Sequence, residues 1–277
     1  MANESTALNN NASIAPDKIW ARMRVEAATA AAKEPMLASL LHALILNHDQ
    51  FQDALSYRLA HKLADPEMNT MQWREVCDSA YQKEPEIVEA ALIDLRAVFD
   101  RDPACHEFSQ PLLFFKGYLA LQAQRVSNNL WRHDRASLAQ FLQSRISEIF
   151  AVDIHPRVQI GRGVFIDHAT GIVIGETSVI GDDVSILQNV TLGGTGKDKG
   201  DRHPKIRRGA LISVGSKVLG NIVVGEGAKV AAGSVVLQDV EPHCTVAGVP
   251  AKPVGKCAES NPAETMDQGF YYETYSI

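Results

Sequence analysis

Residues 154–192 read IHPRVQIGRGVFIDHATGIVIGETSVIGDDVSILQNVTL, and this stretch decides the fold because an aliphatic residue returns every six positions. Residues 206–236, IRRGALISVGSKVLGNIVVGEGAKVAAGSVV, continue the same spacing. The repeated positions are Ile154, Ile160, Ile166 and Ile172, then Ile174, Ile180, Ile186 and Leu192, and then Ile206, Ile212, Val218, Val224, Val230 and Val236. A period of six matches neither an α-helix nor a long strand.

A six-residue repeat is typical of a left-handed parallel β-helix, in which three hexads make one triangular coil. The aliphatic residue points into the prism, and a small residue such as Gly161 or Gly175 often follows it where the chain turns a corner. Successive coils would stack at strand spacing, about 4.8 Å, so that each coil covers the apolar row of the one before.

The repeat breaks phase at two places. It restarts two residues late between Ile172 and Ile174, and fourteen residues separate Leu192 from Ile206. The second surplus falls in the Gly-rich, charged segment 193–204, which we expect to leave the prism as an extruded loop. Such loops commonly carry function.

The composition sets wide limits. The chain has 277 residues, 45% hydrophobic and 22% charged, with a net charge of −6, which argues against a general nucleic-acid binder. The cysteines Cys77, Cys105, Cys244 and Cys257 form no Cys-x-x-Cys pair, so we expect reduced thiols and a cytoplasmic protein. Residues 1–15 lack a secretory signal pattern, and no apolar run reaches the length of a membrane span.

The chain divides into four parts, and the fold class is α+β. Residues 1–15 are expected to be a disordered tail, 16–150 an all-α domain, 151–254 the β-helix, and 255–277 a flexible C-terminal tail. Helices are expected over 16–33, 35–45, 51–63, 69–83, 84–99, 111–131 and 135–150, with a forced break before Pro103. The last helices would cap the open end of the β-helix, and the Leu- and Ala-rich helices suggest self-association.

Two groups of polar residues stand out as candidate chemistry. Asp153 and His168 lie on the same face of adjacent coils if one coil holds 18 residues, since Gly171 is 18 positions beyond Asp153. A carboxylate that orients an imidazole makes a general base. The alternative is that His168 is only a corner residue bonded to backbone.

The second group is Arg202 and His203 at the end of the extruded loop, which together could hold an anionic group; the alternative is a solvated loop charge. His155 and His243 are expected to be corner and loop residues. We expect no metal, because no cluster of histidines supplies three ligands. The Gly-rich run at 193–197 is not a P-loop, because the Gly-x-x-x-x-Gly-Lys-Ser/Thr spacing is absent.

At these residues the sequence resembles the serine O-acetyltransferases of the hexapeptide-repeat acyltransferase superfamily, which catalyse the first step of cysteine synthesis from serine. The resemblance covers nearly the whole chain. It is carried by DIHP at 153–156, DHATG at 167–171, GET at 175–177, VTLGGTGK at 190–197, GDRHPKI at 200–206 and AGVPA at 247–251, and in the helical part by EPMLAS at 34–39 and RDPA at 101–104.

The resemblance implies a role for each matching residue. His168 would be the general base that takes the proton of the serine hydroxyl as it attacks acetyl-CoA, and Asp153 its orienting partner. Asp102 and Asp167 would hold the serine ammonium. Arg202 and His203 would engage the serine carboxylate, for which Arg geometry is well matched. No acyl-enzyme is expected.

The family further implies a dimer of trimers, with acetyl-CoA between neighbouring β-helices near Gly194, Val214 and Ala232. This chain reads Ile-Ser-Val-Gly-Ser at 212–216 where the family usually has Ile-Gly-Ala-Gly-Ala, so the coenzyme contacts are carried over weakly. The family is also inhibited by L-cysteine at the serine site.

The C-terminal residues 270–277, FYYETYSI, either pack back on the protein or bind a partner. In the family, a terminal peptide ending in Ile enters the active site of O-acetylserine sulfhydrylase, which assigns Ile277 to partner binding. Two other functions stay open: acetylation of another acceptor, such as an amino sugar, and a non-catalytic scaffold for the sulfhydrylase.

Overall fold

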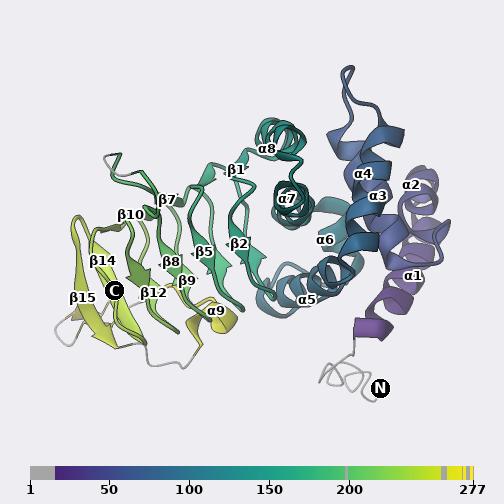
Figure 1. The fold of residues 1–277 in the computed structure, drawn as a ribbon. Coiled ribbons are helices and arrows are strands. Elements are labelled where there is room, and N and C mark those ends of the chain that lie inside the picture. The colour runs from purple at the N-terminus through teal and green to yellow at the C-terminus, as the bar shows by residue number, and fades with distance from the viewer. Residues whose placement is uncertain (1–15, 197–198, 257–260, 270, 273–274, 277) are drawn as a thin grey trace, which may run out of the picture.

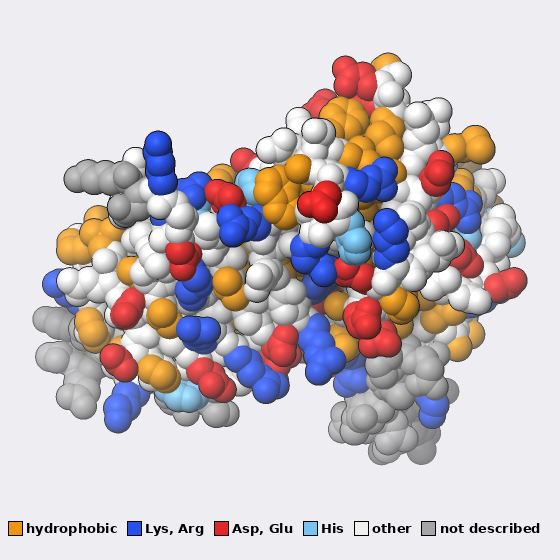
Figure 2. Space-filling view, viewed as in Figure 1, with side chains coloured by type: hydrophobic (Ala, Val, Ile, Leu, Met, Phe, Trp, Pro, Cys, Tyr) orange, Lys and Arg blue, Asp and Glu red, His pale blue; other side chains and the backbone are white. Residues whose placement is uncertain are grey.

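The structure is a computed structural model, and it describes residues 16–196, 199–256, 261–269, 271–272 and 275–276. A bundle of helices at the N-terminal side and a β-helix at the C-terminal side lie end to end, with α7 and α8 between them (Figure 1). This is the α+β fold class expected from the hexad repeat. On the visible face of the described residues, acidic and basic side chains are interspersed over both parts (Figure 2).

The helical part follows the apolar periodicity, with small shifts at the ends. Its helices are α1 (Pro16–Lys33), α2 (Pro35–Leu41), the π-helical turn η1 (His42–Leu46), α3 (Phe51–Leu63), α4 (Thr70–Lys83), α5 (Glu86–Arg101), α6 (Ser109–Phe114), α7 (Lys116–Arg132) and α8 (Ala136–Phe150).

Two of the differences from the expected helices bear on the site. The helix expected over 111–131 is two helices, because Phe115 takes an extended conformation with φ −93° and ψ 106° and so separates α6 from α7. Helix α5 runs to Arg101 rather than to residue 99. It ends at Asp102, since the following Pro103 disfavours helical geometry for the residue before it.

The β-helix is built from short strands that stack into three parallel faces. The strands are β1 (Val152–Ile154), β2 (Gln159–Ile160), β3 (Phe165–Ile166), β4 (Ile172–Ile174), β5 (Val179–Ile180), β6 (Ser185–Ile186), β7 (Thr191–Gly193), β8 (Lys205–Ile206), β9 (Leu211–Ile212), β10 (Lys217–Leu219), β11 (Val223–Val224), β12 (Lys229–Val230), β13 (Val235–Val236), β14 (Cys244–Gly248) and β15 (Ala251–Lys256). Face A is β1-β4-β7-β10-β13, face B is β2-β5-β8-β11, and face C is β3-β6-β9-β12-β14, which β15 extends at its end.

The register confirms the prism and corrects one expectation. Ile174 pairs with Leu192, eighteen residues on, as a regular coil requires. In the first coil Asp153 pairs with Val173, twenty residues on, because the two-residue phase break lies inside that coil. The expectation that Gly171 is one coil beyond Asp153 was therefore wrong. Leu192 pairs with Val218, twenty-six residues on, since the loop over 193–204 is extruded as expected.

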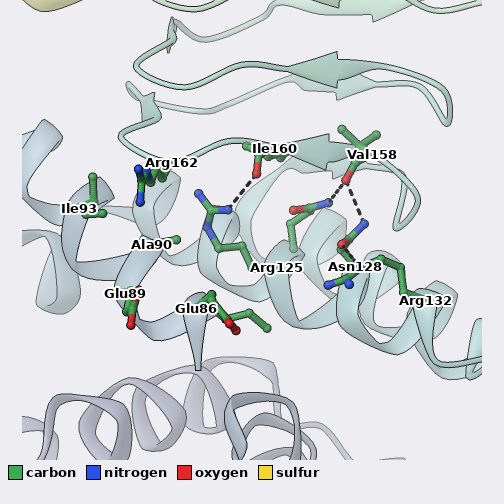
Figure 3. Close-up of a pocket in the computed structure, with 12 residues that line it drawn as sticks. Glu86, Glu89, Ala90, Ile93, Arg125, Asn128, Arg132, Val158, Ile160 and Arg162 are labelled. Atoms are coloured by element: carbon green, nitrogen blue, oxygen red, sulfur yellow. Dashed lines mark hydrogen bonds between the residues drawn. The ribbon is translucent and has the colours of Figure 1, made fainter. Parts of the chain in front are cut away.

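The two ends of the prism are closed in different ways. At the far end β14 turns back into β15, which pairs antiparallel with it and covers the last strand of face C. At the near end α7 lies across the first coil. Its Gln124 and Asn128 both donate to the Val158 carbonyl at 3.1 Å (Figure 3). Asn128 also donates to the Pro156 carbonyl at 2.8 Å, so carbonyls that have no preceding coil are hydrogen-bonded.

Part of the C-terminal segment is packed rather than free. The short helix α9 (Pro262–Thr265) buries Pro262 and Ala263, and Lys229 of β12 donates to the Asp267 carbonyl at 3.1 Å. The expectation of a flexible tail from residue 255 does not fit residues 261–269. The backbone of β16 (Tyr271–Tyr272) pairs with β17 (Tyr275–Ser276), and Ile277 lies outside the described residues, as do Cys257 and residues 1–15.

A buried ion pair joins the helices to the first coil. The Asp94 carboxylate of α5 is fully buried, and its Oδ2 accepts from Arg125 Nε at 3.0 Å, Arg125 Nη2 at 2.7 Å and Gln122 Nε2 at 3.1 Å. Its Oδ1 accepts from the backbone N–H of Val164 at 3.0 Å. Arg125 also donates to the Ile160 carbonyl, on the wall of a cavity of about 290 Å³ between α5, α7 and β2 (Figure 3).

We expect Asp94→Ala to lower the free energy of unfolding by about 3–5 kcal/mol, because it leaves the Arg125 charge buried without its partner. Asp100→Ala on the same helix is the matched control, since its pair with Arg96 is solvent-exposed and should contribute less than about 1 kcal/mol. Urea unfolding of both variants measures this difference. Equal losses would contradict a special role for the buried pair.

Candidate active site

The turn that carries His168 is strained, and the strain turns the imidazole outward. His168 and Ala169 have φ of 55° and 63°, a left-handed conformation that is uncommon for two successive non-glycine residues. The two surplus residues of the first coil are accommodated here. As a result Ala169 is fully buried, while the His168 side chain is 71% exposed.

The start of α7 supports this turn. Lys116 Nζ donates to Thr170 Oγ1 at 2.5 Å, and Gly117 lies so close to the Ile166 carbonyl that a Cβ would stand 2.1 Å from its oxygen. The N–H of Gly171 donates to the Ala151 carbonyl at 2.8 Å, just before β1. Glycine at position 117 is therefore required for the helix to approach the turn.

The Asp167 carboxylate lies beside His168, and the Asp102 carboxylate lies near Asp167. Asp167 Oδ2 is 3.7 Å from His168 Nε2, and Asp102 follows directly on α5. Burial raises the pKa of Asp167, the His168 imidazole offsets part of this rise, and the negative charge of Asp102 adds to it. The carboxylates expected to share one ammonium group are thus close enough to repel each other, and a cation between them would relieve that repulsion.

Asp153 is not hydrogen-bonded to His168 in the part of the chain that the structure describes. It points outward from β1, and its Oδ1 accepts from Gln143 Nε2 at 2.7 Å. The two-residue break places Asp153 opposite Val173 on face A, whereas His168 stands at the preceding corner.

Arg202 and His203 stand together at the corner between faces A and B. Thr177 Oγ1 accepts from the N–H groups of Arg202 and His203 at 3.0 and 3.1 Å. His203 Nδ1 lies 2.9 Å from Thr177 Oγ1 and accepts from the Thr177 N–H at 3.2 Å. Burial lowers the pKa of His203, and the charge of Arg202 lowers it further. The neutral ring with its proton on Nε2 fits these contacts, and this N–H has no acceptor among the described residues.

Two neighbours of this pair were not singled out from the sequence as site residues. Gly175 lies under the His203 ring, where a Cβ would come within 2.1 Å of Nε2. Glu176 Oε2 pairs with Arg202 at 2.9 Å, and its Oε1 pairs with Arg157 at 3.1 Å. Hydrogen bonds from Arg202 and Arg157 lower the pKa of Glu176 despite some desolvation. The signal was a Gly-Glu-Thr triplet directly after the buried Ile174.

The register separates the two groups within one chain. His168 lies at the corner where face C passes into face A, and His203 at the corner where face A passes into face B. Face A, with Asp153 and Val173 on its outer side, lies between them. One chain therefore holds the two groups of polar residues along the two edges of one face.

The three positions expected to line coenzyme A follow the same division. Val214 and Ala232 come two residues after Ile212 and Val230, which pair with each other and stack above Ile186 and Ile166, so they continue the corner of His168. Gly194 instead lies at the corner of His203, where its Cβ position is 3.5 Å from His203 Nε2.

No group of three or more His, Cys, Asp or Glu residues in the described ranges could hold a metal ion. No helix in those ranges has the length and apolar character needed to cross a membrane.

Comparison with known proteins decides the family. A family model described as "Serine acetyltransferase, N-terminal" matches residues 19–123. The serine acetyltransferase of Salmonella typhimurium is 56% identical over 252 residues, which covers 91% of this chain and 92% of that protein. The chain belongs to the serine acetyltransferase family. It is therefore an acyltransferase.

Solved structures agree over most of the chain. A serine acetyltransferase in complex with cysteine is 52% identical, with a TM-score of 0.91, and the match covers 93% of this chain and all of that one. The serine acetyltransferase of Brucella abortus in complex with coenzyme A is 48% identical, with a TM-score of 0.85 and coverage of 87% and 96%. That of Neisseria gonorrhoeae in complex with serine is 50% identical, with a TM-score of 0.83 and coverage of 86% and 97%.

We expect His203 to titrate below the ordinary histidine pKa of about 6.5 and to be neutral at pH 7. Arg202→Gln should raise the pKa of His203, because it removes a nearby positive charge, whereas Glu176→Gln should lower it, because it removes a negative one. NMR titration of ¹⁵N-labelled imidazoles, assigned with His203→Gln, measures the pKa in each variant.

The same shift has a consequence for stability. Because the folded-state pKa of His203 lies below the unfolded value, its neutral form contributes stability above about pH 6.5 that is lost as the pH falls through the folded-state pKa. An Arg202→Gln variant whose His203 pKa stayed the same or fell would contradict the assigned electrostatics.

Proposed function

We propose that this chain transfers the acetyl group of acetyl-CoA to the hydroxyl of L-serine, giving O-acetyl-L-serine and free CoA, the first step of cysteine synthesis from serine. The observation that carries the proposal is the charge layout along the two edges of face A. One edge presents two carboxylates and an imidazole, and the other presents an arginine and a neutral imidazole N–H. An amino acid offers the complementary ammonium and carboxylate.

In this mechanism the substrate is bound through its two charges and reacts through its hydroxyl. Asp102 and Asp167 hold the ammonium, while Arg202 and the Nε2–H of His203 hold the carboxylate. His168 takes the hydroxyl proton as the oxygen attacks the thioester carbonyl. The tetrahedral intermediate then collapses, the CoA thiolate leaves, and the proton on His168 neutralises it. The complex of the Neisseria gonorrhoeae relative with serine supports this choice of acceptor.

The protonation state of two cysteines supports direct transfer without an acyl-enzyme. Burial raises the pKa of Cys77 to about 12 and that of Cys105 to about 12, so both are protonated thiols at neutral pH and poor nucleophiles. Neither Cys77 nor Cys105 forms a disulfide, which fits the reduced thiols of a cytoplasmic protein.

Asp153 is assigned to orient His168, although it bonds Gln143 in this chain. The turn of His168 is tied to the residue before Val152 of β1, through the Gly171–Ala151 hydrogen bond, and the imidazole is exposed. A change of its side-chain torsions would carry the ring from Asp167 toward face A. The carboxylate would then fix the tautomer and stabilise the imidazolium.

The complete site forms between neighbouring chains, because one chain carries its two halves at different corners. We assign the chain to trimers, with acetyl-CoA between adjacent β-helices near Gly194, Val214 and Ala232. The complex of the Brucella relative with coenzyme A supports the cosubstrate. Two trimers would then associate through α1 and α2, which expose Val25, Met36, Leu37 and Leu40.

We expect release of the CoA thiol from acetyl-CoA to depend on L-serine and to fail with L-homoserine, L-threonine and glucosamine. His168→Asn should lower kcat by about 10²- to 10⁴-fold because it removes the general base, and Asp153→Asn should cause a smaller loss. Thiol release followed with a chromogenic disulfide measures this. Near-normal turnover of His168→Asn, or release with glucosamine but not serine, would overturn the assignment.

Membership of the family is also the basis for proposing a regulatory ligand, L-cysteine, and a protein partner. L-Cysteine carries the ammonium and carboxylate of serine with a thiol in place of the hydroxyl, so it would compete for the same charges. The complex of a relative with cysteine supports this. We assign O-acetylserine sulfhydrylase as the partner that captures the C-terminal carboxylate at Ile277.

We expect deletion of Ile277 alone to abolish co-elution with O-acetylserine sulfhydrylase and to leave serine acetylation unchanged, because the deletion removes the captured side chain and shifts the carboxylate. Size-exclusion chromatography of the mixed proteins measures the complex. An Ile277→Val variant is the matched control and should retain binding. Unchanged co-elution of the deletion variant would contradict the proposal.

A further inference from the structure

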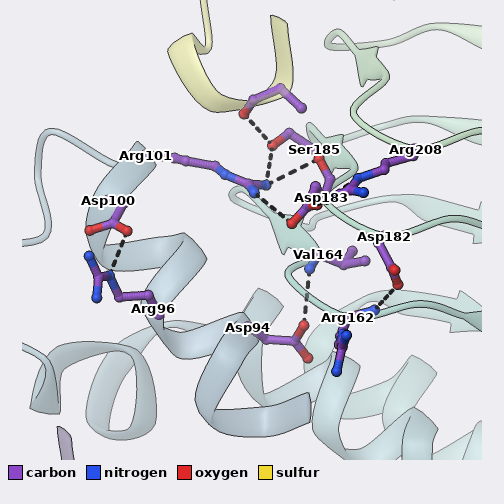
Figure 4. A network of polar contacts seen from close by, with 11 residues as sticks. Asp94, Arg96, Asp100, Arg101, Arg162, Val164, Asp182, Asp183, Ser185 and Arg208 are labelled. Atoms are coloured by element: carbon purple, nitrogen blue, oxygen red, sulfur yellow. Dashed lines mark hydrogen bonds and ion pairs between the residues drawn. The ribbon is translucent and has the colours of Figure 1, made fainter. Parts of the chain in front are cut away.

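Arg101, the last residue of α5, is buried against the β-helix. Its side chain is 5% exposed; Nη1 donates to Ser185 Oγ at 3.1 Å and Nη2 lies 3.7 Å from Asp183 Oδ1 (Figure 4). These partners belong to β6 and the turn before it, in the second coil. These contacts hold the C-terminal end of α5 at the second coil of face C.

Ser185 extends this contact to the C-terminal segment. Its hydroxyl is fully buried and donates to the Ala263 carbonyl of α9 at 2.8 Å, so the same oxygen is left to accept from Arg101 (Figure 4). Arg101 and Ala263 lie 84 and 78 positions from Ser185 in the sequence. Together the three residues form one continuous series of polar contacts, which we call the Arg101–Ser185–Ala263 link.

The link lies beside β3, the strand that leads into Asp167. Ser185 pairs with Phe165 in the neighbouring coil, and Asp167 N–H donates to the Ile186 carbonyl at 2.9 Å. Asp102 follows Arg101 directly, and its own turn is closed by Ala104 N–H donating to its Oδ1 at 2.8 Å. Holding Arg101 on β6 therefore sets the separation between Asp102 and Asp167.

We infer that the Arg101–Ser185–Ala263 link positions Asp102 for the substrate ammonium, so that the C-terminal segment 261–269 supports the amino-acid site from outside it. This inference rests on the proposed function, because it takes L-serine as the ligand of Asp102. Arg101 is a positioning residue: the contacts that bury it are with Asp183 and Ser185, and none is with the site.

The test is a double-mutant cycle with Arg101→Gln and Asp102→Asn in the full-length protein, with KM for L-serine, KM for acetyl-CoA and kcat measured for each variant. Arg101→Gln alone should raise KM for L-serine by roughly 2- to 30-fold, the range for residues that act on a site through another residue. KM for acetyl-CoA should stay within about twofold. In the Asp102→Asn background, Arg101→Gln should add little, since the group it positions is already neutral.

Arg208→Gln is the matched control. Arg208 also pairs with Asp183, at 2.9 Å, but from the exposed side and without a contact to Ser185, so its loss should leave KM for L-serine unchanged. Ser185→Ala is the second variant, which cuts the link while keeping Arg101 and its charge, and should raise KM for L-serine less than Arg101→Gln does. It decides the question if Arg101→Gln does not fold.

The outcomes separate the inference from the proposed function. Wild-type protein that releases no CoA with L-serine overturns the proposed function. Active wild type with unchanged KM in Arg101→Gln and Ser185→Ala, or with full additivity of Arg101→Gln and Asp102→Asn, overturns the positioning role alone. Equal effects of Arg101→Gln and Arg208→Gln would show that Asp183, and not the link, is what matters.

Discussion

Stacking of one coil on the next is the constraint on which the rest of this molecule depends. Each short strand hydrogen-bonds to the strands one coil away, so a residue's position along the repeat decides which face or corner it occupies. A side chain can move to another corner only if its coil shifts in register. That shift would break every contact made by the inward aliphatic residues of the coil. The separation of His168 from His203 by face A follows from this register, and it is the basis for the proposal that a second chain completes the site.

The helical part contributes what the coils cannot supply. A first coil has no preceding coil to receive its carbonyl groups, and α7 provides side-chain donors for them. The buried Asp94 carboxylate then fixes α5 to the same coil, with both oxygens hydrogen-bonded. Once both helices are fixed, their ends lie at the proposed site: α7 begins under the His168 turn, and α5 ends at Asp102. The same two helices thus cap the first coil and border the proposed site.

Much of the β-helix was predictable because the hexad is a local sequence pattern that determines how distant coils stack. The inward row, the extruded loop and the position of the phase break could all be read from residue types alone. The length of the first coil could not, because a two-residue surplus can fall in the coil on either side of Ile172. The corner at Gly175 and Glu176 was visible only as a polar triplet. The contact of Arg101 with Ser185 and that of Ser185 with α9 each join segments about 80 residues apart, and no spacing rule predicts them. The roles of His168 and Asp153 came from resemblance to the family.

The packing of residues 261–269 limits how far Ile277 can lie from the β-helix. Lys229 holds the Gly269 carbonyl beside β12, so only seven residues lie between Gly269 and Ile277. Fully extended, the eight residues from 270 to 277 reach at most about 28 Å. A protein that captures the terminus would have to contact the flank of the β-helix near β12, in the fourth coil, and could not stand off at a distance. A tether this short restricts a bound partner to a small volume around its anchor.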